Sequence, residues 1–367
     1  IASTSPPSAA AISEPISAWK GRAPPILGRR RMLSSMMTKR NSTRMAPDQL
    51  VTLDERAEAL PGFELEQAEG AGAGELRIAI VGRPNVGKST ILNRLVGQKI
   101  SITSRRPQTT RHRILGIKTD AATQIVFVDT PGLHMQQPRA MNRYLNRAAA
   151  DALQDVDVVV LVLEGTRWQK DDDWALEMLE RVSCPVIAAI NKTDRVSDKK
   201  TLLPYLAALA EKRDFAALIP VCARTGEHLE ELEAAVRNYL PVSPPLFPED
   251  QVTDRSERFL AAELVREKLF RKLGEEIPYG LSVEIERFRT ENNTLHIHAL
   301  IWVEKSGHKA IVIGARGERL KEVGREARED MQRAFGQKVF LNLWVKVKEG
   351  WADDERALHS LGYRDDG

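Results

Sequence analysis

The segment Leu76–Arg94 constrains the fold more than any other part of this chain. Residues Arg77–Val81 predict a short buried strand, residues 82–89 read GRPNVGKS, and Thr90–Leu95 predict a helix. The pattern G-x-x-x-x-G-K-[ST] between a strand and a helix is typical of a phosphate-binding P-loop, in which backbone N–H groups and a helix N-terminus surround an anion. This segment therefore predicts an α/β domain that binds a nucleoside triphosphate.

The pattern also assigns roles to individual side chains of the loop. Lys88 would reach the β- and γ-phosphates, and the Ser89 hydroxyl would be a ligand of Mg²⁺. The residues expected around the phosphates are Gly82, Asn85, Val86, Gly87, Lys88, Ser89 and Thr90. The loop alone does not select the base of the nucleotide.

From residue 76 to residue 240, predicted strands alternate with helical stretches. Several strands are nearly continuous apolar runs, such as VDVVVLVL and VIAAI, which are typical of strands buried on both faces of a parallel sheet. The predicted strands are Arg77–Val81, His112–Lys118, Gln124–Asp129, Asp157–Leu163, Pro185–Ile190 and Leu218–Cys222. We expect a mostly parallel sheet with helices on both faces and a ligand at the carboxyl ends of its strands.

An acidic residue ends the third of these strands. Asp129 begins the turn DTPG, where its carboxylate would hold Mg²⁺ through water and the Gly132 N–H would meet the γ-phosphate. The polar loop of residues 105–111, RRPQTTR, lies between this turn and the P-loop, and Thr110 or alternatively Thr109 is its candidate metal ligand. A loop ordered by γ-phosphate and Mg²⁺ and released after hydrolysis is a GTPase switch.

The sequence NKTD at residues 191–194 selects the base. The carboxylate of Asp194 can accept hydrogen bonds from guanine N1–H and N2–H₂, and adenine has neither donor, so adenine would leave this carboxylate unpaired. Asn191 would either bond the base edge or brace the loop. The stem of Lys192 would cover the base face. This motif predicts a guanine nucleotide.

A further motif follows the last predicted strand. The backbone N–H of Ala223 would reach guanine O6, with Cys222 and Arg224 beside it. Cys222 and Cys184 both lie in apolar stretches, so we predict reduced core residues in place of a disulfide.

Four prolines in residues 241–250 predict a stiff linker, which we place at 241–252. Beyond it the pattern predicts a helix over 253–273, two strands, two helices joined by GARG, and a last strand. The later elements are Leu281–Arg289, Thr294–Val303, Ala310–Ile313, Glu318–Phe335 and Val339–Lys348. This order is that of the bacterial (type II) KH fold, whose GxxG loop lies against single-stranded RNA.

Within this second domain, the residues expected to contact RNA lie in and after the GxxG loop. They are Gly314, Ala315, Arg316, Gly317, Arg319 and Lys321. Glu322, Glu326 and Glu329 interleave with the arginines of the following helix, so a solvated face of Glu–Arg pairs is the alternative interpretation of that helix. His296 and His298 share a strand face without a third metal ligand, and we interpret them as surface residues.

Charge and composition limit the remaining possibilities. The chain has a net charge of +3, but residues 1–45 contain eight Lys/Arg and one acid, so the rest is slightly acidic and any nucleic-acid site must be local. It has no run of 18 apolar residues, so we expect no transmembrane helix. Residues 1–74 have the composition of a disordered tail. Their acid-poor start, residues 1–44, is also compatible with an organelle transit peptide, and Met45 with a native start.

The motifs together resemble the translation-factor class of GTPases, and residues 76–363 resemble the Era family of ribosome-assembly GTPases. The likeness lies in the stretches ISITSRRPQTTRHRI, VDTPGLH, EGTRW and VKVKEGWADDERALHSLGY. The chain departs from the family where Cys222-Ala223-Arg224 replaces the usual Ser-Ala-Lys, and its first 74 residues have no counterpart. Composition and motifs together predict a disordered or non-native tail at 1–74, a P-loop GTPase domain at 75–240, a linker at 241–252, and a type II KH domain with a C-terminal tail at 253–367.

The resemblance also implies a function. The chain would bind GTP or GDP with Mg²⁺, hydrolyse GTP slowly, bind small-subunit rRNA near its 3′ end, and act in assembly of the 30S subunit. Its partner would be the small ribosomal subunit, and it would be a cytoplasmic monomer, with peripheral attachment to the inner membrane as an option. Two other classes stay open. They are a signalling or membrane-associated GTPase with a protein-interaction module, and a P-loop kinase or ATPase, against which NKTD argues.

The catalytic candidates follow from the same comparison of motifs. Leu133 stands where a Ras-like GTPase has its water-orienting glutamine, so intrinsic hydrolysis should be slow. In related GTPases, an asparagine at the position of Asn85 helps to seat a K⁺ ion that supplies positive charge at the transition state. The candidate catalytic residues are therefore Lys88, Asn85, Thr110 and Gly132.

Overall fold

The structure is a computed structural model that describes residues 77–120, 123–133, 140–154, 156–239, 246–274, 277–351 and 353. All of these belong to one compact unit of the chain, residues 68–367. The expected N-terminal tail and residues 241–245 of the proline-rich linker lie outside the described residues.

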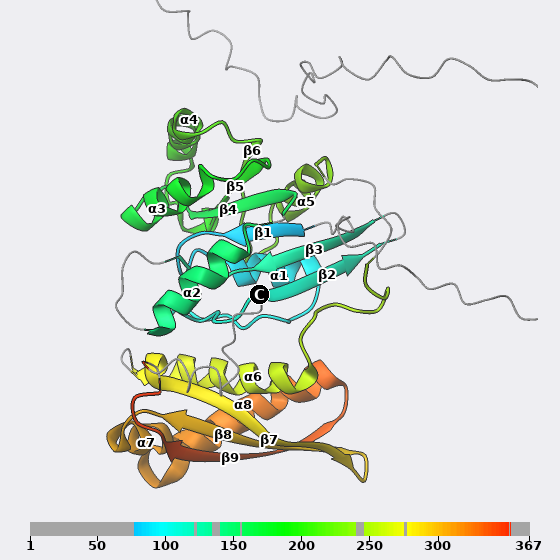
Figure 1. Ribbon diagram of the computed structural model, residues 1–367, viewed down its shortest axis with the longest axis vertical. Coiled ribbons are helices and arrows are strands. Elements are labelled where there is room, and N and C mark those ends of the chain that lie inside the picture. The colour runs from blue at the N-terminus through cyan, green and yellow to red at the C-terminus, as the bar shows by residue number, and fades with distance from the viewer. Residues whose placement is uncertain are drawn as a thin grey trace, which may run out of the picture. The chain divides into compact units, whose positions relative to one another are not determined.

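The first part of this unit is built on a six-stranded sheet (Figure 1). Its strand order is β2-β3-β1-β4-β5-β6, and every neighbouring pair is parallel except β2 and β3. The strands are β1 Arg77–Val81, β2 Ile114–Thr119, β3 Gln124–Asp129, β4 Val158–Glu164, β5 Val186–Asn191 and β6 Ala217–Pro220. The predicted mostly parallel α/β sheet is confirmed.

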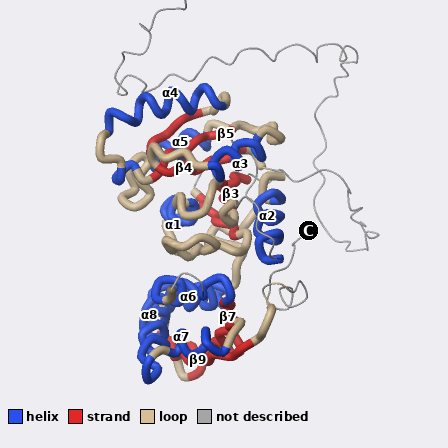
Figure 2. The backbone as a smooth tube through the Cα atoms, turned by 90° about the vertical axis from the view of Figure 1, so that its left-hand side faces the viewer, coloured by secondary structure: helices blue, strands red, loops and turns tan. Residues whose placement is uncertain are grey.

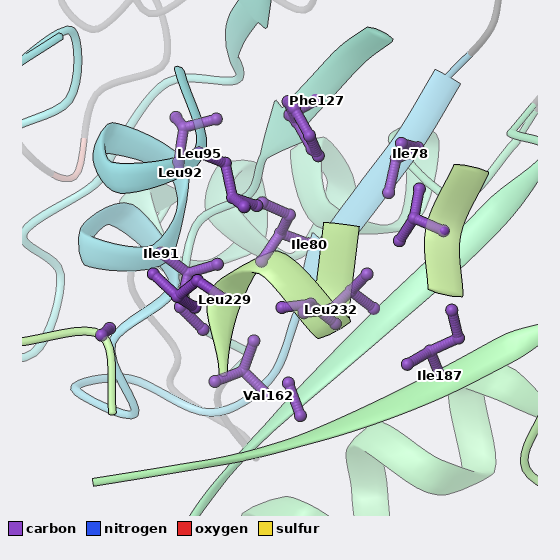
Figure 3. Packing of buried hydrophobic residues seen from close by; sticks show 14 of the residues in the cluster. Ile78, Ile80, Ile91, Leu92, Leu95, Phe127, Val162, Ile187, Leu229 and Leu232 are labelled. Atoms are coloured by element: carbon purple, nitrogen blue, oxygen red, sulfur yellow. The ribbon is translucent and has the colours of Figure 1, made fainter. Parts of the chain in front are cut away.

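Helices cover both faces of this sheet because the strands are apolar on both sides. Ile78 and Ile80 of β1 pack into one core with α1 and α5, and Figure 3 displays the close packing of this cluster. Ala79 and Val81 point to the opposite face and pack with residues of α2, α3 and α4. The helices are α1 Lys88–Val96, α2 Ala140–Asp151, α3 Lys170–Leu179, α4 Leu202–Lys212 and α5 Leu229–Arg237.

The second part is a three-stranded sheet with helices on one face (Figure 2). Strand β8 pairs antiparallel with β7 and parallel with β9, so β9 is an edge strand. The elements are α6 Glu257–Lys272, β7 Leu281–Glu291, β8 Thr294–Val303, α7 Ser306–Ile313, α8 Glu318–Phe335 and β9 Lys338–Val347. Helix, two strands, helix, GxxG, helix and strand is the predicted KH order, and the fold class is confirmed.

The start of α6 differs from the expectation. The sequence predicts a helix from residue 253, whereas α6 begins at Glu257 after Ser256, whose side chain accepts a hydrogen bond from the Phe259 N–H. The preceding residues pair with strand β2 instead. The Val252 carbonyl accepts from the Ile117 N–H at 2.9 Å, and an Asp254 carboxylate oxygen accepts from the Leu115 N–H at 3.0 Å. These bonds satisfy backbone groups of an edge strand, so the chain stays extended there.

Candidate nucleotide-binding site

The P-loop joins β1 to α1 and curls around its own lysine. Gly82 and Gly87 have φ of 142° and 109°, and a Cβ at Gly82 would lie 2.4 Å from the Val162 carbonyl oxygen, so only glycine fits. The Lys88 ammonium donates to the carbonyls of Gly82 and Arg83 at 2.9 and 3.0 Å. Burial lowers the pKa of Lys88 to about 8, although the Asp129 carboxylate opposes this shift.

Three oxygen-bearing side chains meet beside the first turn of α1. The Ser89 hydroxyl donates to Asp129 Oδ2 at 2.7 Å and lies 2.9 Å from the Thr110 hydroxyl. Burial raises the pKa of Asp129, although its hydrogen bond from Ser89 opposes the shift. Asp129 Oδ1 is buried without a hydrogen-bond partner in the described part of the chain. Hydroxyl and carboxylate oxygens are ligands that Mg²⁺ accepts, so this group fits a magnesium site.

The two threonines of the switch loop have different surroundings. Thr110 is buried beside Ser89, whereas the Thr109 hydroxyl donates to the Arg106 carbonyl at 2.6 Å. Of the two candidates, only Thr110 therefore lies next to Asp129.

Asn191, at the end of β5, connects two loops of the site. Its Nδ2 donates to the Val86 carbonyl at 2.7 Å, and its Oδ1 accepts from the Ala223 N–H at 3.0 Å. Of the two roles considered for Asn191, these contacts match the bracing of the loop.

Asp194 lies near the surface and accepts two hydrogen bonds from the last motif. The Cys222 thiol donates to its Oδ1 at 3.2 Å, and Arg224 Nε donates to its Oδ2 at 3.1 Å. The thiol hydrogen bond and, to a smaller extent, Arg224 lower the pKa of Asp194 despite some desolvation. Cys222 and Cys184 are both free thiols, as expected.

Glu164 is a residue of this site that the sequence reasoning missed. It ends β4 and pairs with Lys192 at 2.9 Å and with the P-loop Arg83 at 3.0 Å, while Lys192 also donates to the Asn85 carbonyl at 2.5 Å. Burial opposes ionisation, but Lys192 and Arg83 outweigh it and lower the pKa of Glu164. Its place at the carboxyl end of an apolar strand, like that of Asp129, was the available signal.

The turn after β3 lies against the P-loop. A Cβ at Gly132 would lie 2.7 Å from the Pro84 ring, so the close approach requires glycine. Leu133 is 1% exposed and packs in the core, where its side chain cannot orient a water. Residues 134–139 lie outside the described residues.

These groups line two adjoining clefts that are large enough for a nucleotide. One, of about 460 Å³, is bordered by the P-loop, the switch loop and Gly132. The other, of about 880 Å³, is bordered by Asn191, Lys192, Asp194 and Ala223. Both volumes lie in the range of small-molecule sites.

A second candidate site lies at the GxxG loop. Gly314, Arg316 and Gly317 all have positive φ, and the side chains of Ala315 and Arg316 are exposed. Arg319 is turned back toward α7, where it donates to the Ile311 carbonyl. Lys321 borders a groove of about 690 Å³ between α8 and β9. The sequence reasoning did not single out four further residues of this groove, Arg325, Arg328, Leu341 and Leu343.

The described residues contain no group of three or more His, Cys, Asp or Glu side chains that could hold a metal ion. In the same part of the chain, no helix combines the length and apolar character needed to cross a bilayer.

The fold and the site define a class of protein, a P-loop GTPase that carries a C-terminal KH domain. Residues 77–192 match the family described as 50S ribosome-binding GTPase, and residues 276–352 match the KH domain family.

Comparison with known proteins identifies the family. GTPase Era of Marinobacter nauticus is 60% identical over 288 residues, which cover 78% of this chain and 94% of that protein. GTPase Era of Pseudomonas fluorescens is 58% identical, with coverages of 78% and 96%. A solved structure of Era with MgGDPNP and nucleotides 1506–1542 of 16S rRNA matches with a TM-score of 0.76 and 37% identity, over 78% of this chain and 98% of that one. This chain belongs to the GTPase Era family, and it is a GTPase that binds guanine nucleotide.

Proposed function

We propose that this chain is a GTP-hydrolysing switch that binds small-subunit rRNA near its 3′ end and acts in assembly of the 30S subunit. The observation that carries the proposal is a set of hydrogen bonds between the KH domain and residues 103–111, which comprise the switch loop and the two residues before it. Arg106 Nε donates to the Phe270 carbonyl at 2.6 Å, and the Thr103 N–H donates to Glu267 at 3.0 Å. A loop that responds to the γ-phosphate is thereby attached to the first helix of an RNA-binding domain.

Buried charged groups strengthen the same junction. Arg111 is fully buried and donates to the Leu281 carbonyl at 2.8 Å, at the start of β7. Arg266 of α6 pairs with Glu263 at 2.5 Å and donates to the Thr109 carbonyl at 2.5 Å. Because Thr109 is next to Thr110, a movement of Thr110 on nucleotide exchange would change these bonds. Nucleotide state and KH domain would be coupled through them.

The nucleotide would be held by the P-loop, the NKTD loop and the last motif. These residues are Gly82, Asn85, Val86, Gly87, Lys88, Ser89, Thr90, Asn191, Lys192, Asp194, Cys222, Ala223 and Arg224. Ser89, Thr110 and Asp129 would hold Mg²⁺, and the ion when bound would neutralise charge on the β- and γ-phosphates. Lys88 and the Gly132 N–H would stabilise the transferred phosphoryl group, and Asn85 would seat K⁺.

RNA would lie on the GxxG loop and in the groove beside it. Gly314, Ala315, Arg316, Gly317, Arg319 and Lys321 would contact the RNA, with the backbone close to the strand and the cations on its phosphates. The partner of the chain would be the small ribosomal subunit. The protein would be a monomer in the cytoplasm, with peripheral attachment to the inner membrane as an option. Its GTPase domain would span residues 75–240 and its KH domain residues 253–367. Magnesium and potassium are parts of this proposal.

The test is RNA binding by a variant with Ala315→Asp and Arg316→Asp. Filter binding to a 3′-terminal small-subunit rRNA fragment should fall severely, most at low salt, because two carboxylates would face phosphates. Calorimetry should give an unchanged affinity for GDP.

The matched control carries Lys199→Asp and Leu203→Asp, the same change of charge on exposed residues of the GTPase domain. It should bind the fragment like the parent. Normal RNA binding by the loop variant would instead favour a GTPase whose C-terminal domain is a protein-interaction module.

A further inference from the structure

The KH sheet has a second face, which carries exposed rings. Along β9 the side chains alternate, so Leu341 and Leu343 face the groove beside α8 whereas Phe340 and Trp344 point away from it. Phe340 is 48% and Trp344 41% exposed. We call this second face of the sheet the outer face. It is formed by alternate side chains of β7, β8 and β9, among them His296, His298, Trp302, Phe340 and Trp344.

The rings of the outer face are arranged in cross-strand contacts. The centroid of His296 lies 5.1 Å from that of Phe340, and the centroid of His298 lies 5.3 Å from that of Trp344. Trp302 donates its indole N–H to Glu284 at 2.9 Å, which fixes the ring. Rigid rings on a sheet are the platform on which single-stranded nucleic acid stacks in several unrelated folds, because every base has a π-face.

The outer face is also positively charged at both ends. Lys346 and Lys348 place their ammonium groups 5.9 and 5.8 Å from the centre of the Trp302 ring. Arg289 and Lys338 are exposed at the other end, where β7 and β9 flank the Thr294 end of β8.

The acids on or beside this face have partners of their own. Glu291 pairs with Arg287, Glu286 pairs with Lys346 at 3.7 Å, and Glu284 accepts from Trp302. The cations of the face outnumber these three acids, so its net charge is positive and complements a phosphate backbone. The cations are Arg287, Arg289, Lys338, Lys346 and Lys348.

Two other occupants fit this face less well. A membrane contact also uses exposed aromatic rings, but it needs them on a continuous apolar face. On this face Leu300 is buried, and His296, His298, Glu284 and Arg289 stand among the rings. A protein interface core is depleted in Lys, whereas Lys346 and Lys348 lie over the Trp302 ring of this face.

We propose that the outer face is a second RNA-binding surface, on which unpaired bases stack on Phe340 and Trp344. This inference rests on the proposed function, since the first surface would be the groove on the opposite side of β9. Because β9 is an edge strand, RNA leaving the groove has to pass one strand, about 5 Å wide, to reach these rings. The chain would then hold a longer RNA than a single KH groove, which clamps about four nucleotides.

The test compares two labelled RNAs by fluorescence anisotropy. The long probe corresponds to nucleotides 1506–1542 of 16S rRNA, the segment in the solved Era complex. The short probe is a single strand of about six nucleotides from its 3′ end, enough for the groove alone. Phe340→Ala with Trp344→Ala should weaken the long probe by roughly tenfold for each base stack lost. It should leave the short probe, the melting temperature and GTP turnover without RNA unchanged.

Three further variants make the result specific. Phe340→Tyr with Trp344→Phe keeps both rings and should bind the long probe like the parent. Tyr239→Ala removes an exposed ring of the GTPase domain and should change neither affinity. The loop variant with Ala315→Asp and Arg316→Asp should weaken both probes, which tests the groove separately.

The outcomes separate the two claims. If the loop variant weakens both probes while the Phe340/Trp344 double variant binds the long probe normally, the outer face is not an RNA surface and the proposed function stands. An equal loss for both probes in the double variant would mean that it disturbs the groove, and would also overturn the inference. The inference would also be overturned if the double variant bound RNA normally but no longer bound vesicles of anionic phospholipid. If the loop variant binds both probes normally, the groove assignment fails, and a long-probe loss in the double variant still supports the outer face.

Discussion

The Nδ2 of Asn191 donates a hydrogen bond of 2.7 Å to the backbone carbonyl of Val86, which joins the base-recognition loop to the P-loop. The same side chain accepts from the Ala223 N–H at 3.0 Å, so three segments far apart in the sequence meet at one amide. All three residues are buried. One side chain thus sets the distance between the phosphate end and the base end of the site.

Asn191→Ala should therefore destabilise the nucleotide-free protein. The substitution leaves a buried carbonyl and a buried N–H without partners, which costs about 2–4 kcal/mol in the free energy of unfolding. Urea unfolding measures this change, and GDP affinity should fall with it. Thr193→Ser, which keeps the hydroxyl that donates to the Val221 carbonyl, is the neighbouring control. A variant as stable as the parent would show that the amide is not a brace.

Asp194→Asn should change the base preference. An amide at this position offers a donor to the 2-oxo group of xanthine and keeps only one acceptor oxygen for the two guanine donors. We expect GDP affinity to fall by roughly 100-fold or more and XDP affinity to rise. Calorimetry with both nucleotides measures it, and Asp198→Asn, the same change four residues away, should have no effect. Unchanged guanine preference would remove Asp194 from base recognition.

Nucleotide binding should take up a proton at alkaline pH. Burial lowers the pKa of Lys88 to about 8 in the nucleotide-free protein, and phosphates beside the ammonium group would raise it. At pH 8 about half of the lysine is neutral, so GDP binding should take up roughly 0.5 proton, and the affinity should fall as pH rises through 8.

Calorimetry in buffers of different ionisation enthalpy measures this uptake. Lys88→Arg keeps its proton throughout this range and should abolish the linkage even if it binds less tightly. Uptake near zero at pH 8 in the parent would contradict the position of Lys88 against the phosphates.

Turnover should depend on the monovalent cation. If Asn85 seats K⁺, GTP hydrolysis should rise several-fold when K⁺ replaces Na⁺ at constant ionic strength. Asn85→Ala should remove the difference. Equal rates in the two salts would exclude this mechanism. No group would then be known to replace the water-orienting glutamine, whose position the buried Leu133 occupies.

The strands and the site loops were predictable because their signals are local. A glycine pattern, an apolar run and the polar residue at its end lie within about ten residues of each other, so β1, β3 and β5 and their loops followed from sequence. The helix Glu318–Phe335 was predicted to the residue because Gly317 and Gly336 flank it in the left-handed conformation.

What the sequence did not reveal depends on contacts between distant residues. Glu164 pairs with Arg83, more than 80 positions earlier, and with Lys192, more than 25 positions later. No local pattern encodes such a pairing. The start of α6 was predicted too early for the same reason, because Val252 and Asp254 pair with the distant strand β2. The choice between Thr109 and Thr110 likewise required the position of Ser89 in space.

The central claim is that RNA bound to the KH domain controls GTP hydrolysis, and GTP turnover with and without the 3′-terminal rRNA fragment tests it most directly. The account predicts slow turnover by the parent alone, faster turnover with the fragment, and no stimulation in the variant with Ala315→Asp and Arg316→Asp, whose turnover without RNA should match the parent. Stimulation of that variant to the level of the parent, or turnover by the parent that the fragment does not change, would contradict the account.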